Sequence, residues 1–255
     1  MDITPDTHVA KIATRHPGTI RVFQRHGIDF CCGGKRPLAD ASAEQGLDLE
    51  ALRRELAAAA AGPEADERDW DEAPLAELVD HIVTRFHDRL REELPRLAAM
   101  ADRVLTVHGE KHPDVLPALA RTFHGLRAEL ESHTMKEEQI LFPWICEMER
   151  GATGGASRGC GVAGLPGGAG VPGASVEGPI AVMEAEHDDA ARALAELRRL
   201  TGGFQPPTGA CTTFRGLYHG LAELEADTHR HIHLENNVLF PRAQELEAEV
   251  TGIPA

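Results

Sequence analysis

Residues 229–241 read His-Arg-His-Ile-His-Leu-Glu-Asn-Asn-Val-Leu-Phe-Pro, and residues 132–143 read Ser-His-Thr-Met-Lys-Glu-Glu-Gln-Ile-Leu-Phe-Pro. Each stretch contains a His-x-x-x-Glu pair followed by an apolar run and a proline. Four residues advance about 400° along an α-helix, so the histidine and the glutamate of each pair lie one turn apart on the same face. Each stretch therefore presents one imidazole and one carboxylate to a single point.

The repeat extends upstream of both stretches. His87-Asp88 and His187-Asp188 precede them and are themselves 100 residues apart. The repeated unit is one histidine, a connection, and a His-x-x-x-Glu pair. Two such units predict a two-metal site whose ligands are His87, His133, Glu137, His187, His231 and Glu235.

An isolated pair of this spacing has a simpler interpretation, a surface interaction worth a few tenths of a kcal/mol. The surrounding apolar residues argue against it. The predicted buried seam of the first unit is Leu126, Leu130, His133, Glu137, Ile140 and Trp144, and that of the second is Leu221, Leu224, Thr228, His231, Glu235 and Val238. Burying a histidine and a carboxylate there costs several kcal/mol unless they are paired or coordinated. Its occurrence twice, in register, favours coordination.

Composition excludes several classes of protein. The formal charge of −15 at pH 7 disfavours binding to nucleic acids and to anionic membranes, which require a basic face. We find no apolar run near the ~20 residues of a membrane span and no secretory signal. The five cysteines have no disulfide-framework spacing, which favours a reducing cytoplasm.

Periodicity and the positions of proline and glycine predict an all-α protein with a small helical N-terminal domain at residues 1–62, a polar linker at 63–73 and a four-helix bundle at 74–255. The predicted helices of the bundle run over 74–107, with a bend at Pro95, and over 113–149, 179–200 and 209–249. Residues 151–178 contain eleven glycines and no periodicity, and they are predicted to be a mobile connection.

The ligand types favour iron. Imidazole and carboxylate without thiolate suit redox iron or manganese better than structural zinc. If both glutamates bridge and an oxo or hydroxo group is shared, two six-coordinate irons keep roughly two open positions for small molecules. Ferritin-like di-iron bundles carry Glu-x-x-His motifs instead, so this order of residues indicates a different bundle.

The N-terminal domain contains two adjacent cysteines, Cys31 and Cys32, followed by two glycines. Adjacent Cα atoms are about 3.8 Å apart, too close for ordinary disulfide geometry. Lys35 and Arg36 are expected to favour the thiolate form, which predicts reactive or metal-handling thiols. The alternative is a pair of buried cysteines that act only as small hydrophobic residues.

Other histidines fall outside the repeat. His81 is expected in the core or at its boundary. His229 and His233 flank His231 and cannot share its face, and His233 could pair with His229. A carboxylate hydrogen-bonded to a ligand imidazole could be Glu184 or could come from another helix, and the sequence does not decide between them.

The chain resembles the Repair of Iron Centres family of iron-sulfur cluster repair di-iron proteins. The resemblance rests on Asp-Phe-Cys-Cys-Gly-Gly at 29–34, His-Thr-Met-Lys-Glu-Glu-Gln-Ile-Leu-Phe-Pro at 133–143, Glu-His-Asp at 186–188 and Leu-Glu-Asn-Asn-Val-Leu-Phe-Pro at 234–241. It implies a family-specific N-terminal domain joined to a hemerythrin-like, up-down four-helix bundle. It also implies two non-haem irons held by the same six residues, with Glu137 and Glu235 bridging.

The family resemblance implies repair of iron-sulfur clusters damaged by nitric oxide or oxidants, with damaged iron-sulfur proteins as partners and Cys31 and Cys32 as handlers of iron. The alternative functions are nitric oxide reduction at the di-iron centre, and hemerythrin-like binding or sensing of O2 or NO. Reversible O2 binding in hemerythrins uses a fifth histidine, and none of the histidines of this sequence can be assigned to that role from its position. The sequence does not decide whether the chain forms a homodimer through the cysteine domain.

Overall fold

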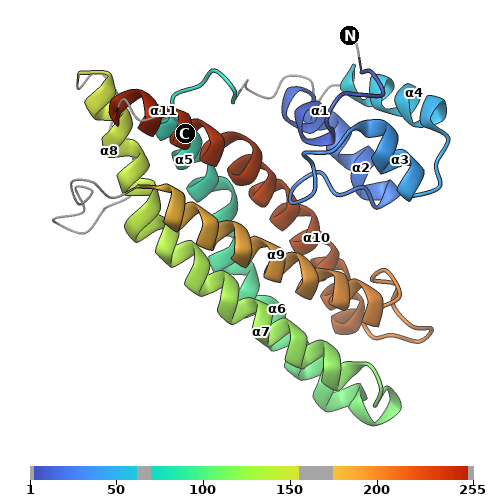
Figure 1. The fold of residues 1–255 in the computed structure, drawn as a ribbon. Helices are drawn as coiled ribbons and strands as arrows, with labels where there is room; N and C mark the ends of the chain where they lie inside the picture. Colours follow the sequence, from blue (N-terminus) through green and yellow to red (C-terminus); the bar gives the residue numbers. More distant parts are fainter. Residues whose placement is uncertain (1–2, 62–69, 155–174, 252–255) are drawn as a thin grey trace.

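The computed structural model describes residues 3–61, 70–154 and 175–251, and these form no strand, only an isolated β-bridge between His8 and Pro37 (Figure 1). The predicted all-α class is confirmed. The N-terminal part contains α1 (Val9–Arg15), η1 (Pro17–Thr19), α2 (Ile20–His26), α3 (Leu38–Glu44) and α4 (Leu49–Ala60).

Four long helical rods form the bundle. In chain order they are α5, η3 and α6 (Leu75–Ile82, Val83–His87, Asp88–His108); α7, η5 and α8 (Leu116–Lys136, Glu137–Leu141, Phe142–Ala152); α9 (Glu177–Leu200); and α10, η6 and α11 (Thr212–Leu234, Glu235–Leu239, Phe240–Thr251). A 3-10 turn, η4 (Gly109–Lys111), joins the first two rods. The second begins at Leu116 rather than at the predicted Pro113, and α6 continues through Pro95.

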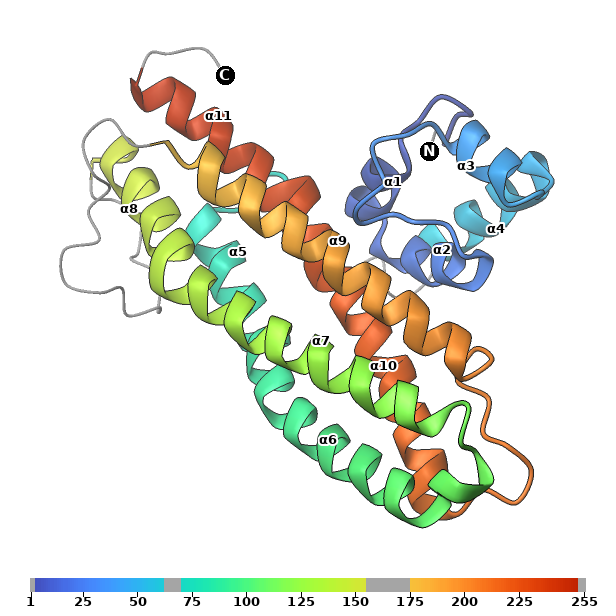
Figure 2. The same cartoon turned by 60° about the horizontal axis from the view of Figure 1, so that its bottom comes forward.

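The rods pack in a closed ring, because α6 contacts α7, α7 contacts α9, α9 contacts α10 and α10 contacts α6 (Figure 2). This is the predicted up-down bundle. Most of the glycine-rich stretch predicted to be mobile lies outside the described residues. No helix in the described part of the chain is long and apolar enough to cross a membrane.

Three of the rods contain a five-residue π-helical segment, namely η3, η5 and η6. Each ends with an N–H that reaches the carbonyl five residues back, for example from Phe142 to Glu137. Prolines at the second position of α8 and α11, Pro143 and Pro241, have no N–H to continue the ladder beyond η5 and η6. Such insertions are frequent at functional sites, and each one here contains a predicted metal ligand.

The π segment η5 makes the predicted seam wrong beyond Glu137. Ile140, predicted to be buried, is 56% exposed, whereas Leu141 is 2% exposed. Likewise Ile145 is fully buried and Trp144 only partly so. An extra residue in the turn rotates everything that follows it by about one position, so the core face moves from Ile140 and Trp144 to Leu141 and Ile145.

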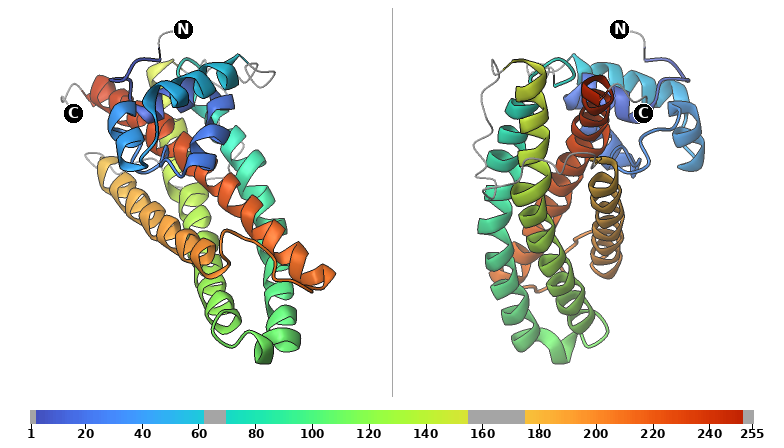
Figure 3. Two further views of the ribbon diagram at one scale, coloured as in Figure 1. Left: turned by 90° about the vertical axis from the view of Figure 1, so that its right-hand side faces the viewer. Right: turned by 60° about the vertical axis from the view of Figure 1, so that its left-hand side comes forward.

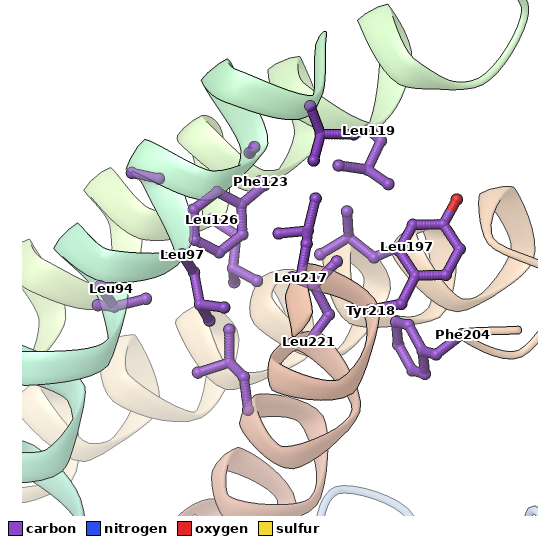
Figure 4. Close-up of a cluster of buried hydrophobic side chains, with 14 of the residues drawn as sticks. Leu94, Leu97, Leu119, Phe123, Leu126, Leu197, Phe204, Leu217, Tyr218 and Leu221 are labelled. Atoms are coloured by element: carbon purple, nitrogen blue, oxygen red, sulfur yellow. The ribbon is translucent and has the colours of Figure 1, made fainter. Parts of the chain in front are cut away.

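Two hydrophobic clusters fill the bundle, one on each side of the predicted ligands. The larger one contains Leu97, Phe123, Leu126, Leu217 and Leu221, which converge from α6, α7 and α10 (Figure 4). The other lies at the α8–α11 end. Since the ligand positions fall between these clusters along every rod, the polar residues are enclosed by apolar packing above and below.

The N-terminal domain packs on the outside of the rod that carries His231, through contacts of α1 with α10 and η6 (Figure 3). Ile232 of α10 is fully buried in the hydrophobic core of that domain. The Gln24 amide also donates to the carbonyl of Ala226, at 3.3 Å. One helix of the bundle, α10, therefore directs the predicted ligand His231 to the interior on one side and contacts the cysteine domain on the other.

Candidate metal centre

The structure brings all six predicted ligands together in the interior, each at most 4% exposed. They form two overlapping groups whose ligand atoms lie within 4.8 Å of one another. We call the group of His87, His231, Glu137 and Glu235 position A, and the group of His133, His187, Glu137 and Glu235 position B. Both glutamates belong to both positions.

Each position takes one histidine from each half of the chain. In position A the Nε2 atoms of His87 and His231 are 3.0 Å apart, and in position B those of His187 and His133 are also 3.0 Å apart. Two ligand nitrogens at right angles and about 2.1 Å from one metal ion would be separated by about 3.0 Å. The spacing therefore fits two imidazoles aimed at one ion.

The two carboxylates divide their oxygens between the positions. Glu137 Oε1 lies 3.3 Å from His133 Nε2 and Glu137 Oε2 lies 3.4 Å from His87 Nε2. Glu235 Oε1 lies 2.8 Å from His231 Nε2, and its Oε2 lies 3.1 Å from His187 Nε2. One oxygen of each carboxylate thus faces each position.

Hydrogen bonds at the outer ring nitrogens select the tautomer. His87 Nδ1–H donates to Glu138 at 2.7 Å, and His133 Nδ1–H donates to Glu186 at 2.9 Å. His187 Nδ1–H donates to the side-chain oxygen of Asn236 at 2.7 Å. With the proton on Nδ1, the Nε2 lone pair is free to bind a metal, and such partners also raise ligand basicity.

These contacts indicate that a positive charge between the four histidines and the two glutamates would be stabilising. In position B both Nδ1 atoms are donors, so two neutral imidazoles would place two Nε2 lone pairs 3.0 Å apart. Both oxygens of the fully buried Glu137 lack a hydrogen-bond donor among the residues that the structure describes. A buried carboxylate in that state costs several kcal/mol. A cation between the histidines and the carboxylates removes both problems, so the residues fit a bound metal.

The pKa values of the clustered histidines and carboxylates point the same way. Burial opposes the charged form of His133, but Glu137, Glu235 and Glu186 outweigh it and raise its pKa to about 9. Burial likewise opposes ionisation of Glu235, yet His231 and His187 hold its pKa well below the usual range. The carboxylates around His133 thus make the site negative enough to keep the His133 imidazole protonated at neutral pH, and the same negative charge would favour a metal ion.

Sequence reasoning had left the hydrogen-bond partners of the imidazoles open, and the structure assigns them to residues from other helices rather than to Glu184. All three follow or precede a ligand in the chain: Glu138 follows Glu137, Asn236 follows Glu235, and Glu186 precedes His187. Adjacency to a ligand was the available signal. Which helix each partner reaches could not be read from it.

A cavity of about 340 Å³ opens between α7, α9 and α10 and reaches the site. Its lining includes His133, His187 and His231, and Lys136, which is ion-paired with Glu186. Small molecules therefore have a route to both positions, because each contributes at least one histidine to the cavity wall.

The cysteine turn is organised by Asp29. Its carboxylate accepts the backbone N–H groups of Cys31 at 2.9 Å, Cys32 at 3.0 Å and Gly33 at 2.8 Å. Gly34 has to be glycine, because a Cβ there would lie 2.5 Å from the Phe30 carbonyl oxygen.

The expectation that basic neighbours favour the thiolate is wrong for Cys31. Its hydrogen bond with the Cys32 thiol, its burial and the charge of Asp29 raise its pKa well above the ordinary value. Arg36 is ion-paired with Glu44. Cys31 is 4% exposed, whereas Cys32 is partly exposed.

His233 has a role that sequence reasoning missed. It is 1% exposed and does not pair with His229 as considered above; its Nδ1–H donates to the carbonyl of Phe30 at 3.0 Å. Its Nε2 lies 3.1 Å from the Thr14 hydroxyl. The residue thus joins the helix that contains His231 to the cysteine domain. His81, partly buried against Trp70, lies at the boundary as expected.

Comparisons with known proteins agree with this architecture. A family model described as the hemerythrin HHE cation binding domain matches residues 78–158 and 171–243, and one described as a domain of unknown function, DUF542, matches residues 5–60. The chain is 44% identical to the iron-sulfur cluster repair protein YtfE of Citrobacter koseri over 238 aligned residues. The aligned region covers 93% of this chain and 96% of the relative. Over the same shares it is 43% identical to YtfE of Escherichia coli and 42% identical to that of Cronobacter sakazakii.

Proposed function

The chain belongs to the family of iron-sulfur cluster repair proteins with a hemerythrin HHE domain, and on this basis we propose that it repairs iron-sulfur clusters damaged by oxidative or nitrosative stress. It does so in the cytoplasm by supplying iron to the damaged protein. The observation that carries the proposal is the pair of buried positions that share Glu137 and Glu235.

Each position would hold one iron ion, and Glu137 and Glu235 would each offer one carboxylate oxygen to either ion. This assignment is supported by the division of the Glu137 and Glu235 oxygens between the two pairs of histidines. Bound iron supplies redox chemistry and open coordination sites for small ligands. The chain supplies three imidazoles whose tautomer is fixed by hydrogen bonds at Nδ1, a location between two apolar clusters, and negative charge that favours retention of cations.

The test is iron content and absorption spectrum of the purified protein and of His231→Ala. We expect about two irons per chain in the wild type, as required by two shared positions, and about half of that in the variant, because His231 belongs to position A alone. His124→Ala is the matched control, since His124 is exposed on α7 and its imidazole bonds Asp102 away from the site. Stoichiometric zinc, or a His231→Ala protein with unchanged iron, would contradict the assignment.

Delivery is tested separately, with the iron-loaded protein and a purified [4Fe-4S] enzyme whose cluster has been damaged by nitric oxide or peroxide. We expect recovery of the recipient's cluster spectrum at the expense of the donor's iron. Cys31 and Cys32 are proposed to handle the iron in transit, so Cys31→Ser with Cys32→Ser should slow recovery but leave the donor's iron content unchanged. Recovery at the wild-type rate would remove the cysteines from the proposal.

Nitric oxide reduction is the second candidate, supported by the cavity of about 340 Å³ that leads to three ligand histidines. Anaerobic nitric oxide consumption with a chemical reductant tests it. Multiple turnovers that survive both cysteine substitutions would favour an enzyme, whereas a single stoichiometric binding event would favour O2 or NO binding and sensing.

A further inference from the structure

The two halves of the site are related by a pseudo-twofold repeat, and the repeat extends to the outer hydrogen bonds. His87 corresponds to His187, and their acceptors Glu138 and Asn236 correspond too, since each follows a glutamate ligand. By the same relation His133 corresponds to His231. The acceptor of His133 is Glu186, the residue that precedes His187.

The residue that precedes His87 is Phe86, so the counterpart of Glu186 is an aromatic ring. Phe86 stacks on the imidazole of His231, with ring centroids 5.5 Å apart and planes 8° apart. Among the described residues no side chain or carbonyl accepts from His231 Nδ1, although His231 is only 1% exposed. Glu138 and Asn236 differ in charge but both accept from an imidazole, whereas His231 has no acceptor in the described part of the chain.

Without a carboxylate partner at Nδ1, His231 borders a small cavity with room for water. Thr228, one turn earlier on α10, also has a buried hydroxyl without a partner in the described part of the chain. Thr228, His231 and Phe86 line a cavity of about 20 Å³, which has room for about one water molecule. A neutral water fixes and polarises an imidazole less strongly than a carboxylate does.

We propose that the two metal positions are inequivalent and that position A, held by His87 and His231, is the one that binds iron more weakly and gives it up. In position B both imidazoles have a protein acceptor, whereas in position A only His87 has one. Loss of such an acceptor typically lowers metal affinity 10- to 100-fold. This inference rests on the proposed two-iron site and adds which of the two ions is donated.

Access does not account for the difference. The larger cavity is lined by His231 of position A as well as by His133 and His187 of position B, so an ion in either position can reach it. Glu137 and Glu235 face both positions as well. The two positions differ in whether each imidazole has a hydrogen-bond acceptor at Nδ1, which His231 lacks among the described residues.

The experiment is an anaerobic titration of the metal-free, full-length protein with Co²⁺, followed by its absorption bands, and with Fe²⁺ against a coloured chelator at equilibrium. We expect two binding steps whose dissociation constants differ about 10- to 100-fold. Phe86→Glu places a carboxylate where Glu186 stands in the other half, and should bring the weaker step close to the tighter one. Phe86→Leu removes the ring without adding an acceptor and should keep two separated steps.

A reciprocal variant makes the test independent of one substitution. Glu186→Gln should weaken the tighter step about 10-fold or more and leave the weaker step unchanged. If Phe86→Glu does not fold, Phe86→Gln offers a neutral acceptor and should strengthen the weaker step by a smaller factor. Two equal affinities in the wild type, or a weaker step that a folded Phe86→Glu protein leaves unchanged, would overturn the inference; absence of any metal binding would instead remove the proposed function.

Discussion

The side-chain amide of Asn237 donates to the main-chain carbonyl of Cys31 at 2.9 Å, across 206 positions of sequence. Two residues before Asn237 stands Glu235, one of the two shared carboxylates. With the bond from His233 to Phe30, this contact attaches the cysteine turn to the helical rod that carries two of the proposed metal ligands. The cysteine domain is therefore held in a defined place on the bundle.

Removing this attachment should loosen the cysteine turn while the metal site stays intact. In Asn237→Ala we expect a loss of about 1–3 kcal/mol in the free energy that holds the domains together, because the buried Cys31 carbonyl is left without its donor. Amide hydrogen exchange should rise around residues 28–34 and stay unchanged around His133. Gln205→Ala, an exposed position in the α9–α10 connection, is the control. Unchanged exchange at residues 28–34 would show that packing around Ile232 is sufficient.

The buried His233 should make the stability of the metal-free protein depend on pH. Burial lowers its pKa to about 4, against an ordinary value of 6.5, although the Phe30 carbonyl favours the charged form. Between pH 6.5 and 4 the unfolded chain binds a proton that the folded chain does not, so stability falls as the pH falls, by about 3 kcal/mol in total.

Urea denaturation at pH 7.5 and 4.5 measures this loss. The wild type should lose about 2–3 kcal/mol more between these two values than His233→Gln, which carries no titrating ring. Taking the difference between the two proteins cancels the other histidines. Equal losses in both proteins would show that His233 is protonated without penalty in the folded state.

Glu137 should be required for both ions, because it belongs to both positions. Glu137→Gln keeps the size of the side chain and removes its charge, and we expect metal content to fall to less than one ion per chain rather than by half. Glu131→Gln is the matched control on the same helix, since Glu131 is exposed and pairs with Arg127. A variant that retains one tightly bound ion would show that the carboxylate serves a single position.

Cys31 should react slowly with alkylating agents at neutral pH. Its pKa is raised by the Cys32 thiol, by burial and by Asp29, so little thiolate forms below pH 9. In peptide mapping after iodoacetamide treatment at pH 8, Cys31 should be modified at least about 10-fold more slowly than the exposed Cys211. Asp29→Asn removes the negative charge and should speed the reaction. Equal rates for Cys31 and Cys211 would contradict the raised pKa.

The fold class and the six candidate ligands could be predicted from the sequence because both depend on local periodicity. A His-x-x-x-Glu pair places its two side chains on one helical face whatever the rest of the chain does, and a repeat of the pair implies a symmetric arrangement. The apolar residues around His133 and His231 indicated that this face points inward. The positions of glycine and proline in the N-terminal part were sufficient to predict where its helices begin and end.

Which side chains meet across the helices was decided by the tertiary structure alone. The pairing of His87 with His231, the choice of Glu186 rather than Glu184, and the stacking of Phe86 all depend on how far each helix is rotated about its axis, and no local pattern specifies that rotation. The π segment after Lys136 shows the limit most directly: one added residue moved the core face from Ile140 to Leu141. The sequence by itself determined the chemistry of the ligands, and packing determined their partners, because hydrogen bonding and burial are properties of the space between helices.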